Sequence, residues 1–323
     1  MIQTLPLVLF IIMSEVSIGA FTVLFVLDCR SEVKRSFLIT YGLIYIVLTG
    51  LTYLFQQSFS TPALLNTFTQ LDKAWIGLLA LPLLLFLLLM LPYNLLLWLD
   101  KQAGVSDKKE EHKQSGPSTV RLLRLGLGGL TVLAGLITLF VLAMIYRPLA
   151  SANAGGVFTV ASFFAAALAL GGVMTAMWLG HWYLVTPALS EKPLLFATTL
   201  VLLGVLAQII FAVTAGPTTT YARPSTAPTV TATATTTIPG ATPTPAESIK
   251  PANAPVATPL SAAVIGWLHI LVSFVMPLLL GGLAWKLIRD RSFQSATGML
   301  YLVVVLALAG EAMARGLFLM GLS

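Results

Sequence analysis

The chain has 323 residues, of which 57% are hydrophobic and 9% charged, and its mean hydropathy is +0.92. A soluble domain carries about 25% charged residues, so this composition excludes a water-facing surface over most of the chain. The net charge of +6 does not indicate a nucleic-acid partner, because the basic residues gather in short blocks without interleaved aromatic residues. The single cysteine, Cys29, excludes an intramolecular disulfide and cysteine-ligated iron–sulfur or structural zinc sites.

Long apolar segments follow one another along the chain. A helix needs about 20 apolar residues to cross the hydrocarbon core of a bilayer. Eight segments reach that length, so the sequence predicts an all-α, polytopic bundle of eight transmembrane helices, surrounded by lipid in the cell membrane. The predicted spans are 5–27, 36–56, 75–99, 121–146, 157–186, 194–215, 261–286 and 296–320.

The basic residues between the spans predict the orientation of the helices. Lys and Arg are retained on the cytoplasmic side of a membrane. Alternate connections and helix ends carry thirteen of them: Arg30, Lys34, Arg35, Lys101, Lys108, Lys109, Lys113, Arg121, Arg124, Lys192, Lys286, Arg289 and Arg291. The other connections carry Lys73, Arg147, Arg223 and Lys250. We therefore expect the N-terminus outside and, after eight crossings, the C-terminus outside as well.

One connection differs from the others in composition. Residues 216–259 are rich in Thr and Pro and hold 9 of the 18 prolines in the chain. Such a segment buries too little apolar surface to offset its ordering entropy, so we expect a disordered external linker, either a plain solvated connection or a glycosylated stalk. The predicted organisation is a six-helix region over 1–215, this linker, and a terminal helix pair over 260–323 that packs on the first six.

A few ionisable residues fall inside predicted spans, where each costs about 2.5–3.5 kcal/mol to insert. They are Glu15, His181, His269, Glu311 and Arg315. At 1.5 Å per residue, Glu15, His269 and Glu311 all lie roughly 12–15 Å below the outer surface. We therefore expect these three side chains to line one cavity that opens outward, with Arg315 at its mouth. Arg315 follows Glu311 by four residues, so the two can also form a self-neutralising pair with no further role.

The sequence GHWYLVTP, residues 180–187, places His181, Trp182 and Tyr183 near the cytoplasmic end of the fifth span. These residues fit either an interfacial aromatic anchor or a cofactor site, with His181 as a haem ligand or a hydrogen-bond donor to a quinone. A haem shared by His181 and His269 is not expected, because their depths differ by about 10 Å in a 30 Å core. No helical spacing of His and Glu predicts a metal site.

Two short motifs resemble a known family. The first span contains SEVSIGAF at 14–21, and the last contains GEAMARGLF at 310–318. With the eight helices and both ends outside, these motifs resemble the membrane anchor subunit of dimethyl-sulfoxide-reductase-type enzymes. The resemblance implies a subunit without haem that oxidises menaquinol near the outer face and passes electrons to an external iron–sulfur subunit. The Thr/Pro-rich linker and GHWYLVTP have no counterpart in that pattern.

The leading hypothesis is a membrane subunit of an electron-transfer complex that interacts with quinol and quinone. Glu15, His269, Glu311 and Arg315 are the candidate catalytic residues, because quinol oxidation releases protons that a carboxylate and an imidazole can accept. Two alternatives remain: a transporter that uses the same residues as a proton or cation relay, and a structural or assembly protein without chemistry.

Overall fold

The computed structural model describes residues 4–101, 103–105, 119–150, 155–186, 190–215 and 262–319. Helices form nearly all of this part of the chain, with one isolated β-bridge between Lys34 and Gly104. Eight helical spans within the described ranges are long and apolar enough to cross a membrane. The prediction of an all-α, multi-pass membrane bundle is therefore confirmed. The predicted linker 216–259 lies outside the described residues.

The long helices agree closely with the predicted spans. They are α1 (Leu5–Arg30), α2 (Arg35–Phe59), α5 (Ala80–Leu99), α6 (Thr119–Tyr146), α7 (Gly155–Val185), α8 (Lys192–Ala215), α10 (Met276–Arg289) and α11 (Phe293–Leu319). Four short elements were not expected: α3 (Pro62–Thr67), α4 (Lys73–Ile76), the 3₁₀ turn η1 (Arg147–Leu149) and the π-helix η2 (Leu271–Val275). The predicted seventh span is thus divided into α9 (Ala262–Ile270), η2 and α10, and these three elements are called the seventh span below.

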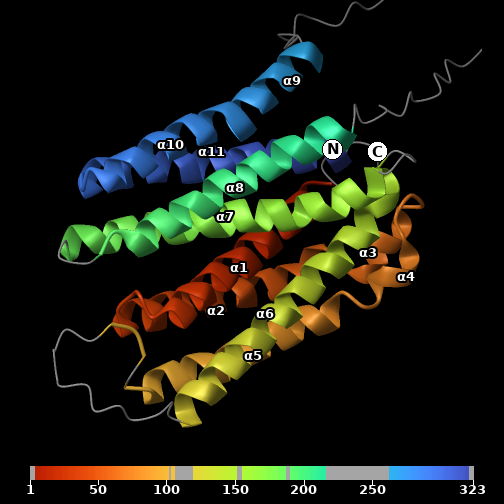
Figure 1. Ribbon diagram of the computed structural model, residues 1–323. Coiled ribbons are helices and arrows are strands. Elements are labelled where there is room, and N and C mark those ends of the chain that lie inside the picture. Colours follow the sequence, from red (N-terminus) through yellow and green to blue (C-terminus); the bar gives the residue numbers. More distant parts are fainter. Residues whose placement is uncertain are drawn as a thin grey trace, which may run out of the picture.

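The helix α1 lies at the centre of the bundle and packs against α2, α6, α7 and α11 (Figure 1). Of its most apolar 18 residues 83% are buried, against 17% in the seventh span. A close approach joins α1 to α7, where Gly19 lies against the backbone of Ala167 and Gly171. Small residues allow such contact between membrane helices, where dispersion replaces the hydrophobic driving force.

The outer surface of the bundle is apolar, as a lipid-facing surface must be. Leu81, Leu95, Trp98, Leu122 and Val305 each expose about 60–70% of their surface. Polar backbone groups are satisfied inside the helices, so these side chains meet lipid without leaving unpaired hydrogen-bonding groups. The chain is therefore a multi-pass membrane protein.

The predicted orientation is tested by labelling exposed positions at opposite ends of the bundle. Lys101 follows α5, and Thr69 lies in the connection between α3 and α4; both are exposed. In a Cys29→Ser background, Lys101→Cys should react with an impermeant maleimide only from the cytoplasmic side, and Thr69→Cys only from outside. Labelling of both from one side would refute eight crossings, and reversed labelling would refute the external termini.

Candidate functional site

A buried cluster of three charged side chains joins helices from opposite ends of the sequence. Arg315 on α11 pairs with Glu311, with 2.7 Å between Nε and Oε1, so the predicted pair over four residues is confirmed. Its Nη2 donates to Oε1 of Glu15 on α1. All three residues are buried. Arg315 therefore joins α1 to α11 inside the bundle.

The charges in this cluster do not balance. Two carboxylates face one guanidinium, which also lies over the ring of Phe163 with Cζ 3.8 Å from the ring centroid. Oε2 of Glu15 has no hydrogen-bond partner among the described residues. With both carboxylates ionised the cluster carries one uncompensated negative charge in an apolar surrounding, which favours uptake of a proton or another cation.

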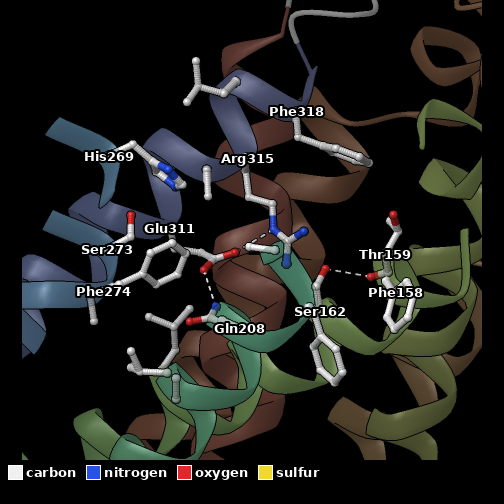
Figure 2. Close-up of a pocket in the computed structure, with 18 of the residues that line it drawn as sticks. Phe158, Thr159, Ser162, Gln208, His269, Ser273, Phe274, Glu311, Arg315 and Phe318 are labelled. Atoms are coloured by element: carbon white, nitrogen blue, oxygen red, sulfur yellow. Dashed lines mark hydrogen bonds and ion pairs between the residues drawn. The ribbon is translucent and has the colours of Figure 1, made fainter. Parts of the chain in front are cut away.

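A cavity of about 380 Å³ adjoins this cluster (Figure 2). It lies between α7, α8, α11 and the seventh span, and its volume falls in the range of small-molecule sites. The residues that line it are Ala150, Phe158, Thr159, Ser162, Ala169, Leu170, Val205, Gln208, Phe211, Ala212, His269, Ser273, Phe274, Ala307, Glu311, Ala314, Arg315, Leu317 and Phe318. Along α11 the lining extends from Phe318 to Ala307, about 16 Å at 1.5 Å per residue.

His269 and Glu311 both line the cavity, as the sequence predicts, and Arg315 lines it with them. Glu15 departs from the prediction because it is fully buried and is not among the lining residues. It reaches the site only through Arg315, which occupies the space between the carboxylate and the cavity residues on α11. The expected contact between the first and last spans is present, and α11 also contacts the seventh span.

Two neutral polar residues at the site were missed by sequence reasoning. Gln208 on α8 donates from Nε2 to Oε2 of Glu311 at 2.8 Å. Ser273 lies in η2, one turn after His269, and is 9% exposed. Neither Ser273 Oγ nor His269 Nε2 has a hydrogen-bond partner among the described residues. Figure 2 shows His269 and Ser273 on one side of Glu311 and Ser162 on the other. A ligand with a polar head can satisfy both free atoms.

Residues His181, Trp182 and Tyr183 lie elsewhere. None of them lines the cavity, and His181 is exposed. The hydroxyl of Tyr183 donates to the backbone oxygen of Ser190, and the ring of Trp182 packs against Phe37. These contacts fix the end of α7 to its neighbours, as an interfacial anchor does. Their role in binding a cofactor stays a prediction.

A second buried charge cluster was missed at the opposite end of α1. Arg124 on α6 pairs with Asp28, and its Nε lies 3.2 Å from Oδ2 of Asp100. The hydroxyl of Tyr93 donates to Asp28 at 3.0 Å. The sequence placed Arg124 among the basic residues at the cytoplasmic helix ends, but the side chain is 1% exposed and faces the bundle. This cluster ties α1, α5 and α6 together.

The described residues contain no group of three His, Cys, Asp or Glu side chains that could hold a metal ion. The site thus offers carboxylate, imidazole, hydroxyl and guanidinium groups beside an apolar cavity. No family model, curated protein or solved structure matches the chain.

Proposed function

We propose that this membrane protein is a subunit of an electron-transfer complex that binds quinol and quinone. One observation carries the proposal: an apolar cavity of about 380 Å³ in which unpartnered Ser273 Oγ and His269 Nε2 lie beside the carboxylate of Glu311. Four phenylalanines line the same cavity, Phe158, Phe211, Phe274 and Phe318. The polar groups at the edge of a quinone ring suit the polar residues of this lining, and the ring and its apolar tail suit the phenylalanines.

The charge balance of the cluster suits quinol oxidation. Removal of two electrons from a quinol releases two protons, which need acceptors at the site. With both carboxylates ionised, the Glu15–Arg315–Glu311 cluster has a net charge of −1, so it can accept one proton, and the imidazole of His269 can accept the second. Gln208 fixes the Glu311 carboxylate in place. The electrons need an acceptor, and the resemblance to anchor subunits of dimethyl-sulfoxide-reductase-type enzymes suggests an external iron–sulfur subunit.

A second candidate is a proton- or cation-coupled transporter, and the interrupted seventh span favours it. Transporters often bind substrate and coupling ions where membrane helices are broken. The π-helix Leu271–Val275 is followed by Pro277, and Ser273 faces the cavity from this interruption. Under this reading the uncompensated negative charge attracts a transported cation.

Quinone binding in lipid nanodiscs separates these candidates. A short-chain naphthoquinone should bind saturably to the wild type, and Ser273→Ala and Glu311→Gln should each weaken binding about tenfold, because the first removes a hydroxyl group and the second replaces a charged acceptor with a neutral amide. Thr131→Val is the matched control, since Thr131 bonds only to its own helix and lies outside the cavity. Equal binding by all variants would contradict the proposal. Cation-dependent proton flux in proteoliposomes, without quinone binding, would favour the transporter.

A further inference from the structure

The seventh span packs unevenly along its length. Its inner part, α10, packs against both α8 and α11, whereas contact with α8 decreases along η2 and α9. Figure 1 shows α9 inclined away from α8. Side chains of α9 are correspondingly exposed: Trp267 exposes 72% of its surface and Leu268 42%. The outer part of this span is therefore held much less firmly than the inner part.

The cavity lies where the seventh span diverges from α8. Phe211 and Ala212 line it from α8, and His269 and Phe274 line it from the seventh span. Its base is closed by a tight contact, because a Cβ added to Gly310 on α11 would lie 2.6 Å from Ser273 Cα. Ala212, at the edge of the cavity on α8, is exposed. The exposed side chains of α9, which borders the cavity through His269, are apolar, so this edge faces lipid.

A point of weakness in the helix coincides with the base of the cavity. Pro277 has no N–H, so the carbonyl of Ser273 lacks its usual donor four residues later. The π-helix Leu271–Val275 occupies the same place. Prolines and π-turns are the usual sites of bending in a helix, because fewer regular backbone hydrogen bonds must be broken there.

We propose that α9 is a lateral gate, hinged at η2 and Pro277, through which the cavity receives an amphipathic ligand dissolved in the membrane. Opening moves α9 further from α8 and widens the access of the lipid leaflet at the outer ends of the helices to Ser273 and Glu311. The polar head of the ligand then reaches these groups while its apolar tail remains between α8 and α9. Only the identification of the ligand as a quinol depends on the proposed function; the gate itself does not.

Accessibility of a single cysteine tests this route without any quinone. In a Cys29→Ser background, Ser273→Cys introduces a near-isosteric thiol at the base of the cavity. Ala307→Cys, also in the buried part of the lining, provides a second position should the first variant fail to fold. Two methanethiosulfonates are compared, one with a dodecyl chain and one with a charged sulfonate. Thr69→Cys is the water-facing reference, and Trp267→Cys is the lipid-facing reference.

We expect the ratio of dodecyl to sulfonate rates at Ser273→Cys to exceed that at Thr69→Cys by at least about tenfold, because a sulfonate enters lipid reluctantly. Pro277→Ala restores a backbone donor and should slow the dodecyl reagent at Ser273→Cys about threefold or more, with Trp267→Cys unchanged. Equal access for the sulfonate, no reaction with either reagent, or no effect of Pro277→Ala would each overturn the gate. Lateral labelling without quinone binding would instead contradict the proposed function and leave the gate standing.

Discussion

Replacing Arg315 with alanine should lower the free energy of unfolding by about 3–5 kcal/mol, because it leaves two buried carboxylates without their cation. Arg315 donates a hydrogen bond to Glu15 through Nη2 and forms an ion pair with Glu311 through Nε, and the three side chains are buried together. Removing either acid instead makes the cluster neutral, since one carboxylate and one guanidinium remain. Glu15→Gln and Glu311→Gln should therefore each be much milder than Arg315→Ala. The measurement is thermal or denaturant unfolding of the purified protein in detergent.

Two further variants separate charge from geometry. Arg315→Lys keeps the charge but cannot bond both acids with a planar fork, so its stability should lie between wild type and Arg315→Ala. The combined variant Arg315→Met, Glu15→Gln and Glu311→Gln removes every charge and should recover much of the lost stability. If the combined variant were as unstable as Arg315→Ala, the loss would come from packing of the arginine and the charge argument would fail.

Gly19→Val should prevent formation of the folded bundle. A Cβ added at Gly19 would overlap the carbonyl oxygen of Ala167 and would lie 3.2 Å from Cα of Gly171. Both neighbours are backbone atoms of α7, so no side chain can move aside, and α1 must separate from α7. Because α1 is the central helix, that separation removes contacts throughout the bundle. We expect the variant to be degraded or to aggregate, observed as loss of the monodisperse peak in size-exclusion chromatography.

Gly126→Val is the matched control for this substitution. Gly126 also lies inside a long membrane helix, α6, but nothing lies within 4 Å of an added Cβ. Both variants change helix propensity in the same way, so only the packing differs. Normal recovery of Gly126→Val with loss of Gly19→Val would attribute the effect to the contact between α1 and α7. Normal recovery of both would contradict the observed packing.

The spans and the pairing of Glu311 with Arg315 could be predicted from the sequence because both depend on local spacing. Apolar length decides a membrane helix, and four residues bring side chains to one helix face. Glu15 was predicted to lie in one layer with Glu311, but its bond to Arg315 joins residues 300 positions apart and needs the packing of α1 against α11. Glu15 was assigned to the cavity from its predicted depth alone. In the structure Arg315 lines the cavity and Glu15 does not.

The remaining parts of the site lacked a clear signal. Gln208 and Ser273 are neutral, so their insertion into lipid costs far less than that of a charge and they do not stand out in an apolar span. Arg124 lies near a helix end, where a basic residue normally faces the cytoplasm, and only the packing brings it to Asp28. The π-helix before Pro277 is a local departure within a continuous apolar run, which hydropathy does not detect.

Photoaffinity labelling tests the central claim most directly. A quinone with an aryl azide on its tail is bound to the protein in nanodiscs, irradiated, and the attachment sites are identified by peptide mass spectrometry. The account predicts adducts at cavity residues such as Phe211 and Phe274, and their loss when excess unmodified quinone is present. Adducts confined to lipid-facing residues such as Leu81 and Leu95, unaffected by the competitor, would contradict a quinone site in this cavity.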